Sequence, residues 1–281
     1  MMLNKFNKLA VNLFALLPYL FFTPNLSFGQ VVFAPVGASQ WMLGGTSVAH
    51  SDVWSATNNA GAITEVKRTQ GGIYSEQRFN ESKLRLSNAS FILPTKYCHI
   101  GASINYFGYQ AFNQQKIGLS IAKKLSNIFS LGVQLNYVAT NIENYGNAGN
   151  VALAGGLLIK PLPSLTLGFS VFNPTQNEYA EFTTERMPSY ARLGCAYDVS
   201  DKITLHTEAD QTLSQSLIFR GGVKYKLHPI IHLAVGASNK PVYYTFGTSI
   251  FLKSIQIDLA TSFHQVLGVT PHLGLSLPVQ K

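Results

Sequence analysis

Charged residues are scarce in this chain of 281 residues, where Asp, Glu, Lys and Arg together make up 12%. Soluble globular proteins carry roughly 25% charged residues. The hydrophobic share here is 46%, and the mean hydropathy is +0.12. This composition argues against an ordinary soluble domain and indicates a membrane environment.

Long hydrophobic runs are also missing. After residue 22, polar residues interrupt every apolar stretch before it approaches the ~20 residues that a membrane-spanning helix needs. A closed β-barrel is the other structure that satisfies its backbone polar groups inside lipid. We therefore expect an all-β fold, a transmembrane antiparallel β-barrel located in the bacterial outer membrane.

Recognisable catalytic and nucleic-acid-binding patterns are absent from the sequence. The seven histidines show no metal-ligand spacing, since Pro229 separates His228 from His232 in a strand region. No GxSxG motif or Gly-rich phosphate loop occurs. Lys and Arg are scattered singly, so the formal net charge of +8 forms no stripe that could track phosphates. We expect no enzyme activity, metal site, cofactor or nucleic-acid partner.

Cysteine is limited to Cys98 and Cys195, although an oxidising periplasm would permit a disulfide. Both residues share the parity of apolar positions on predicted strands that are not neighbours. We therefore predict two free thiols on the lipid-facing side, behaving as small hydrophobes.

The N-terminus has the pattern of a secretory signal peptide. Lys5 and Lys8 give a positive start, residues 9–22 are largely apolar, and small residues surround a predicted cleavage site after Gly29. A retained membrane helix is the alternative, but the apolar part is short and lacks a positive stop. The predicted organisation is a signal peptide at 1–29, a hatch segment at 30–67 and a transmembrane β-barrel at 68–281.

Short segments of about ten residues, separated by polar or Pro/Gly-containing turns, fill the chain beyond residue 67, as expected of a transmembrane barrel. Fourteen strands are predicted, at 68–79, 83–93, 96–109, 112–124, 128–142, 148–160, 163–173, 188–199, 202–211, 216–226, 230–238, 242–252, 254–264 and 269–278. Longer turns are predicted at 143–147 and 174–187. The second is polar and, with a periplasmic chain start, extracellular, where it could bind a partner or be a tolerated insertion.

Alternation with period two assigns the two faces of these strands. Ile255, Ile257 and Leu259 fall on one face, and Gln256 and Asp258 on the other. A soluble β-sandwich would turn the apolar set inward, but the low charge and the many segments favour apolar residues facing lipid. The charged residues predicted to face the lumen, where they could form salt bridges, are Arg192, Glu208, Asp210, Arg220, Lys224 and Asp258.

Aromatic residues concentrate near the ends of the segments, which is typical of the girdles at membrane interfaces. The expected girdle residues are Tyr106, Phe107, Tyr109, Tyr137, Phe172, Tyr197, Tyr225, Tyr243 and Tyr244.

Residues 37–64 do not follow the strand pattern. Small residues suited to tight turns come first, and a polar turn follows. Because the strands downstream already account for a barrel, this segment is predicted to plug the lumen. Its key residues are Gly44, Gly45, Asp52, Asn58, Asn59 and Gly61. Unpaired polar groups would be costly in a closed lumen, so Asp52, Asn58 and Asn59 are expected to tie the hatch to the wall, with Arg192 or Arg220 as possible partners.

This segment resembles the start of FadL-like outer-membrane barrels, and more closely the PorV/PorQ group associated with type IX secretion. Gly44–Val48 match a Gly/Ala-rich first part, 52–56 an Asp-containing stretch, and 58–61 an Asn-Pro-Ala-Gly-like turn in which Asn59 replaces the proline. The resemblance implies a fourteen-stranded barrel with a lumenal plug.

Two functions remain open. The first is a noncatalytic component of a protein secretion or surface-assembly system, with outer-membrane lipids and other secretion or outer-membrane proteins as partners. The alternative is a FadL-like channel for the uptake of hydrophobic small molecules. The inward-facing residues are rich in polar side chains, whereas hydrophobic transport should need an apolar path, and this favours the secretion function.

Overall fold

The computed structural model describes residues 31–178, 187–213 and 215–278. The predicted signal peptide and the middle of the predicted loop 174–187 lie outside these residues. In the part of the chain that is described, no helix is long and apolar enough to cross a membrane.

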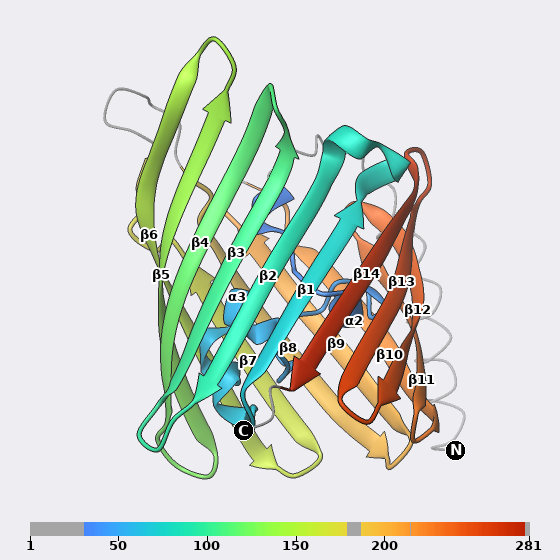
Figure 1. Cartoon of the computed structure of the whole chain (residues 1–281). Coiled ribbons are helices and arrows are strands. Elements are labelled where there is room, and N and C mark those ends of the chain that lie inside the picture. Colours follow the sequence, from blue (N-terminus) through green and yellow to red (C-terminus); the bar gives the residue numbers. More distant parts are fainter. Residues whose placement is uncertain (1–30, 179–186, 214, 279–281) are drawn as a thin grey trace, which may run out of the picture.

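The described residues from 70 to 278 form fourteen strands, the number that the sequence predicts (Figure 1). In chain order they are β1 (Gln70–Gln77), β2 (Arg85–Pro94), β3 (His99–Tyr109), β4 (Phe112–Lys124), β5 (Phe129–Ile142), β6 (Gly146–Leu162), β7 (Leu165–Phe172), β8 (Tyr190–Ser200), β9 (Ile203–Thr212), β10 (Ile218–His228), β11 (Ile231–Asn239), β12 (Val242–Leu252), β13 (Ile255–His264) and β14 (Gly268–Pro278). Every strand pairs antiparallel with its neighbours in sequence, and β1 also pairs with β14. The sheet is therefore a closed barrel without a free edge, as predicted.

The predicted long turn at 143–147 is wrong, because the ladder between β5 and β6 continues almost to its end. Ile142 pairs with Gly146, which leaves only residues 143–145 outside the strands. Asn144 and Gly146 take positive φ angles of 66° and 98°, which close a tight hairpin without splaying its strands.

The predicted facing of the strands is confirmed. On β5, Leu131, Val133 and Leu135 point outward and are about half exposed, while Gln134 and Asn136 point inward and are at most 4% exposed. The same alternation runs around the barrel, so the outer surface is apolar and fits lipid.

The aromatic girdle is confirmed only in part. Tyr106, Tyr109, Tyr137, Tyr197, Tyr225 and Tyr244 are exposed on the outer face. Phe107, Phe172 and Tyr243 are buried in the lumen, where they pack in the hydrophobic core, so their placement in the girdle is wrong. The segment inside the barrel gives inward-facing aromatic residues an apolar environment, and the alternation along the strands does not reveal it.

Both cysteines are free, as predicted. Cys195 lies on β8 with the parity of the outward-facing Leu193 and Tyr197. Cys98 lies one residue before β3, in a turn where its backbone nitrogen donates to Thr95 Oγ1 at 3.2 Å. The prediction that Cys98 sits within a strand is therefore one residue off.

The two ends of the barrel differ. The turns at the lower end in Figure 1 are short, and the strands next to both chain ends, β1 and β14, begin and end there. The upper end carries the longer connections, at 78–84 and between β7 and β8, of which residues 173–178 and 187–189 are described. Outer-membrane barrels have short periplasmic turns and longer extracellular loops. The lower end is therefore the periplasmic end.

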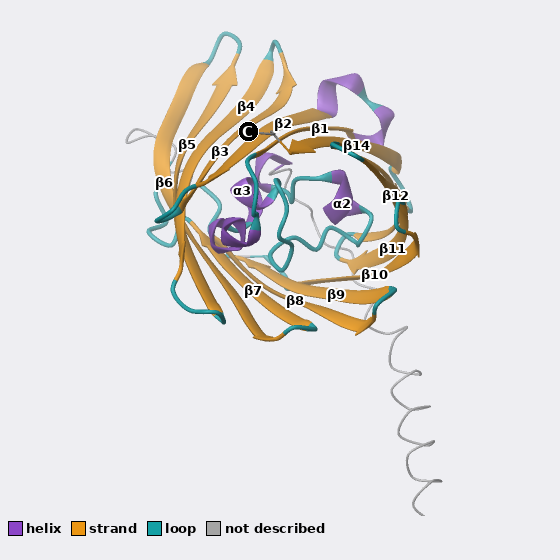
Figure 2. Cartoon of the chain, turned by 60° about the horizontal axis from the view of Figure 1, so that its bottom comes forward, coloured by secondary structure: helices purple, strands orange, loops and turns teal. Residues whose placement is uncertain are grey.

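Residues 31–66, called the hatch below, lie inside the barrel, as predicted (Figure 2). They form η2 (Val31–Phe33), α2 (Ala38–Trp41), α3 (Ser55–Asn58) and η3 (Ala60–Glu65), joined by turns. Hatch side chains pack against the wall, as Phe33 does against Phe172 and Trp41 against Tyr243. The hydrophobic core therefore lies in the lumen, between the hatch and the strands.

Candidate functional site: the hatch and the lumen

Gly44 and Gly45 form a turn that brings the hatch backbone onto β10 and β11. Both have positive φ angles, 75° and 80°, which favour glycine. A Cβ atom on Gly44 would lie 2.6 Å from the carbonyl oxygen of Ala237 and 2.7 Å from that of Gly221, too close for any real side chain. This predicted part of the hatch motif is therefore a point of backbone contact with the wall.

Glycines of the wall allow the same close approach from the other side. A Cβ atom on Gly222 would lie 2.7 Å from the Cα of Leu43, and one on Gly168 would collide with the carbonyl oxygen of Val48. Hatch and wall therefore meet backbone to backbone at several places.

Asn59 joins two parts of the hatch to the wall. Its side-chain amide donates to the carbonyl oxygens of Val48 at 2.6 Å and Leu157 at 3.1 Å, and its Oδ1 accepts from the Gly61 backbone nitrogen at 3.0 Å. Gly61 lies against β6, where a Cβ atom would be 2.7 Å from the Gly156 oxygen. Among the three polar residues expected to tie the hatch to the wall, Asn59 makes this contact.

Asn58 instead holds the hatch together. It donates from Nδ2 to the Val36 carbonyl oxygen at 2.8 Å, and its Oδ1 accepts from the Val36 backbone nitrogen at 3.0 Å. Its expected bond to the wall is absent from the described contacts.

Asp52 also bonds within the hatch. Its carboxylate accepts from Gln40 Nε2 at 2.8 Å and from the Trp54 backbone nitrogen at 3.0 Å. Burial raises the pKa of Asp52, and these hydrogen bonds oppose the shift. The suggested partnership with Arg192 or Arg220 is wrong, because those side chains lie towards the opposite end of the lumen, paired with other carboxylates.

Glu208 on β9 is the wall residue that holds the hatch most directly. Its carboxylate accepts hydrogen bonds from the backbone nitrogens of Ser47 at 2.6 Å and Val48 at 2.8 Å, and from Ser47 Oγ at 3.2 Å. The alternation of β9 predicts that Glu208 faces the lumen but not that it makes this contact, because the residue opposite it depends on the path of the hatch.

Arg192, Asp210 and Arg220 form a buried charged network beside Glu208. Asp210 Oδ2 lies 2.9 Å from Arg192 Nε and 2.7 Å from Arg220, and Arg220 also lies 3.4 Å from Glu208. Arg192 further donates to the Phe33 carbonyl oxygen at 2.8 Å. Four of the predicted lumenal charges, Arg192, Glu208, Asp210 and Arg220, thus meet in one place, whereas Lys224 of β10 lines a different cavity.

Asp258 lies apart from this network. It is buried on β13 and accepts hydrogen bonds from Gln256 Nε2 at 2.9 and 3.1 Å. It forms no ion pair with any described residue, so the suggested salt bridge is wrong. Its ladder partners are Ser249 and Gly274, which offer no cation.

A second polar cluster lies on the wall formed by β1 and β14. The Tyr74 hydroxyl donates to Glu76 at 2.6 Å, and Arg78 pairs with Glu76 at 2.7 Å. His272 Nδ1 lies 2.8 Å from the same hydroxyl, and its ring stacks on Trp41 of the hatch at 4.8 Å. These residues were not among the predicted site residues, although the alternation of β1 and β14 places Glu76 and His272 on the inward face.

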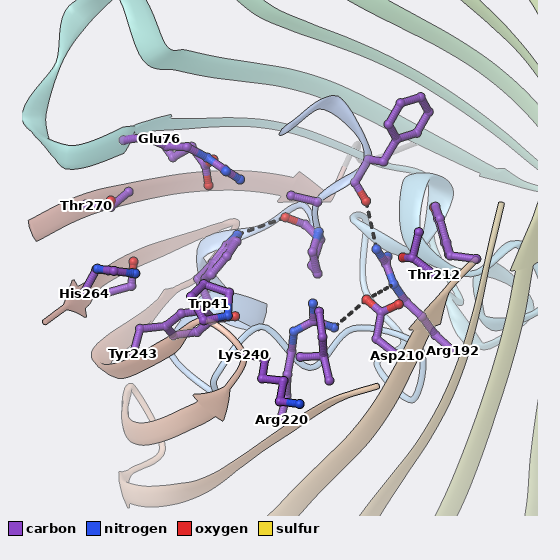
Figure 3. A pocket seen from close by; sticks show the side chains of 18 of the residues that line it. Trp41, Glu76, Arg192, Asp210, Thr212, Arg220, Lys240, Tyr243, His264 and Thr270 are labelled. Carbon is purple, nitrogen blue, oxygen red and sulfur yellow. Dashed lines mark hydrogen bonds and ion pairs between the residues drawn. The ribbon is translucent and has the colours of Figure 1, made fainter. Parts of the chain in front are cut away.

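The two charged clusters face each other across a cavity of about 190 Å³ on the extracellular side of the hatch (Figure 3). Phe33, Trp41, Tyr190 and Tyr243 give it an aromatic lining. The charged lining residues are Glu76, Arg78, Arg192, Asp210, Arg220 and Lys240. The cavity therefore combines an apolar surface with an excess of positive charge.

A second cavity, of about 280 Å³, lies on the periplasmic side of the hatch. His50 and Asp52 of the hatch face His206 and Lys224 of the wall across it. The His50 and His206 rings stack with centroids 4.4 Å apart. Burial, together with the nearby His206 and Lys224, lowers the pKa of His50 well below its ordinary value, so this ring is neutral.

Lys116 is a buried lumenal cation that the sequence analysis did not select. It is 2% exposed, and its Nζ lies 5.7 Å from the ring centre of Phe33 and 5.5 Å from that of Phe172. These distances allow cation–π attraction. The alternation of β4 in the sequence shows that Lys116 points inward. Its aromatic neighbours could not be predicted, because they come from the hatch and a distant strand.

Ion pairs hold the C-terminal end of the hatch, where the chain leaves the lumen. Glu65 lies 2.8 Å from Lys124 and 2.6 Å from Lys160, at the periplasmic ends of β4 and β6. Partial burial alone would raise the pKa of Glu65, but the hydrogen bonds and charges of the two lysines lower it.

No protein-family model matches the chain, and no curated protein matches it. Solved structures do. A Pseudomonas aeruginosa FadL homologue aligns over 87% of this chain and 98% of its own, with a TM-score of 0.64 and 13% identity. This chain has the fold of a FadL-like outer-membrane barrel.

Two toluene transporters share this FadL-like fold. TbuX of Ralstonia pickettii aligns over 87% of this chain and 97% of its own, with 11% identity and a TM-score of 0.64. TodX of Pseudomonas putida covers 89% and 100%, with 11% identity and a TM-score of 0.63. Identities this low describe the fold alone. The fold, the closed barrel and the apolar outer face place the chain among bacterial outer-membrane barrels.

Proposed function

We propose that this barrel is a noncatalytic channel for the uptake of small hydrophobic molecules, with the hatch as its gate. The observation that carries the proposal is the aromatic-lined cavity of about 190 Å³ between the hatch and the barrel wall. Ligand sites are concave and mostly apolar, with a few polar groups that orient the ligand, and this cavity has that character.

The size of the cavity supports a specific class of ligand. An apolar protein cavity of about 150 Å³ holds benzene. The present cavity, about 190 Å³, accommodates one aromatic ring with a small substituent. Arg78, Arg220 and Lys240 favour a substituent that is anionic or accepts hydrogen bonds. The proposed ligand is therefore a substituted monoaromatic compound.

From the sequence, the polar residues predicted to face the lumen favoured a secretion function. In the structure, many of the polar wall groups bond to the hatch or to one another, as Glu208 and Asp210 do, and aromatic residues line the cavity. The polar residues are therefore compatible with an apolar binding site. Neither the described residues nor the comparisons supply support for a secretion component related to PorV and PorQ.

Tryptophan fluorescence can test ligand binding, because the chain has two tryptophans and one of them lines the cavity. We expect benzoate or toluene to quench the fluorescence of the purified barrel in a saturable way, and sucrose to have no effect. Trp41→Phe should abolish the quenching, since the remaining Trp54 is buried away from this cavity, against Tyr74.

Uptake is tested in proteoliposomes with labelled benzoate at neutral pH, where the anion crosses lipid slowly. Faster entry than into protein-free liposomes, with no change for sucrose, is expected. Absence of both quenching and uptake, together with recovery of a secreted or surface protein in a mild-detergent pull-down, would replace the channel by the secretion component.

A further inference from the structure

The periplasmic rim of the barrel carries a lysine at every one of its short hairpins. The turns after β2, β4, β6, β8, β10 and β12 are the ones at this lower end in Figure 1. Each contains a lysine or has one within three residues of it. In the order of the turns these are Lys96, Lys123 with Lys124, Lys160, Lys202, Lys226 and Lys253. Because the barrel is closed, they surround its whole circumference.

Most of these cations form no ion pair among the described residues. Lys124 and Lys160 pair with Glu65 of the hatch. Lys96, Lys123, Lys202, Lys226 and Lys253 are exposed and form no ion pair with any described carboxylate. Lys67 and Arg68, where the chain passes from hatch to barrel, are exposed in the same way. These five lysines are therefore available for an external anion.

The extracellular end shows no such excess among the described residues. Its cations are Arg78, Lys83, Arg85 and Lys240, and its carboxylates are Glu76, Glu81, Glu143 and Glu178. Among the described residues, the carboxylates at the periplasmic hairpins and the exit of the hatch are Glu65, Asp198 and Asp201, while Asp52 and Asp258 lie inside the lumen. The positive charge of the protein is therefore concentrated at one end.

Exposed apolar side chains stand beside the rim lysines. Tyr97 follows Lys96 and is 76% exposed, with the Lys96 ammonium 5.6 Å from its ring centre. Leu125 follows Lys124, Leu227 follows Lys226, and Leu252 precedes Lys253, and all three are more than half exposed. A cation beside an apolar or aromatic side chain suits the headgroup region, where the apolar part meets acyl chains and the charge meets phosphates.

We propose that this ring of lysines binds anionic phospholipid headgroups in the periplasmic leaflet, of the phosphatidylglycerol class. The circular arrangement favours lipid over an acidic protein, since a leaflet surrounds the barrel and one globular partner would contact only an arc. The interleaved apolar side chains favour it too. Basic residues near an anionic membrane surface attract it within about one Debye length, ~10 Å at 0.1 M salt.

Spin-labelled lipids measure this preference directly. With the mature barrel in phosphatidylcholine vesicles at low salt, spin-labelled phosphatidylglycerol should associate about threefold more strongly than spin-labelled phosphatidylcholine. The preference should nearly vanish at 1 M salt, where the Debye length is about 3 Å.

Two double charge-reversal variants show which end of the barrel causes the preference for phosphatidylglycerol. Lys202→Glu/Lys253→Glu should reduce the preference to near one, while the matched extracellular pair Lys83→Glu/Arg85→Glu should keep most of it. All four side chains lie outside the hatch contacts, and heat-modifiable migration on electrophoresis verifies that the barrels are folded. Equal association of the two lipids with the unaltered barrel, or equal losses for the two pairs, would overturn the proposal. The first result would point to an acidic protein at the rim.

Discussion

The carboxylate of Glu208, on the barrel wall, lies 2.6 Å from the backbone nitrogen of Ser47 in the hatch and accepts a hydrogen bond from it. The next backbone nitrogen, of Val48, donates to the same oxygen at 2.8 Å. Two consecutive amides therefore converge on one buried anion. Hydrogen bonds to a charged acceptor are about twice as strong as neutral ones, so this contact is a principal hold on the hatch.

Removing the Glu208 carboxylate should loosen the hatch. Glu208→Ala leaves two buried amides unsatisfied and deprives Arg220 of one partner. We expect the free energy of unfolding in urea to fall by about 3 kcal/mol and the conductance in planar bilayers to rise. Glu65→Gln is the control, because it breaks ion pairs to partly exposed lysines and should cost below about 1 kcal/mol. Equal effects of the two changes would contradict the special role of Glu208.

A methyl group on the wall should displace the hatch. In Gly168→Ala the added Cβ would overlap the carbonyl group of Val48, and backbone cannot move aside as a flexible side chain can. We expect a loss of about 1–3 kcal/mol in urea unfolding and a higher conductance. Gly155→Ala is a matched control, since its Cβ would find Val171 at 3.5 Å, an ordinary contact. A Gly168→Ala barrel that behaves like this control would show that hatch and wall are not in backbone contact there.

Asp52→Ala should weaken the hatch internally. The change removes the acceptor for Gln40 and for the Trp54 backbone nitrogen but leaves the wall contacts of Asn59 and Glu208 in place. We expect the free energy of unfolding to fall by about 1–2 kcal/mol, with a smaller rise in conductance than in Glu208→Ala. Asp201→Ala, in an exposed turn, is the control. Unchanged stability would show that Asp52 does not brace the hatch.

Acid should destabilise the hatch through His50. Its pKa is lowered in the folded state, so the unfolded chain binds more protons below the ordinary histidine pKa of about 6.5. The corresponding stability is fully present above that pH and is lost as the pH falls below it. Urea unfolding at pH 7.5 and 5 should show this loss, and His50→Gln should reduce it. A pH dependence identical in the two proteins would assign it to other groups.

Strand positions and their facing follow from the sequence because alternation reports a local property, the environment on either side of a sheet. Leu131 and Gln134 illustrate it, since neighbours in the ladder repeat the pattern and reinforce it. Lipid and lumen differ so strongly in polarity that each strand can be assigned independently of the others.

Contacts across the lumen, in contrast, cannot be predicted from the alternation in the sequence. The partners of Asp52 and Glu208, and the burial of Lys116 between two aromatic rings, depend on the three-dimensional path of the hatch. The alternation along a strand shows which side chains point inward. It does not show how far along the barrel axis a side chain lies or which segment of the hatch lies opposite it. The placement of Phe107, Phe172 and Tyr243 in the girdle failed for this reason.

The glycine contacts at Gly44, Gly168 and Gly222 have a mechanical consequence. Side chains that interlock must rotate or withdraw before one surface can move past another. Where the two surfaces meet as bare backbone, at these glycines, such obstacles are fewer. A force that pulled the hatch towards the periplasm would have to break the hydrogen bonds of Glu208 and Asn59 to their partners and also separate packed rings such as Phe33 from Phe172. The hydrogen bonds break over a short distance and can reform when the force ends.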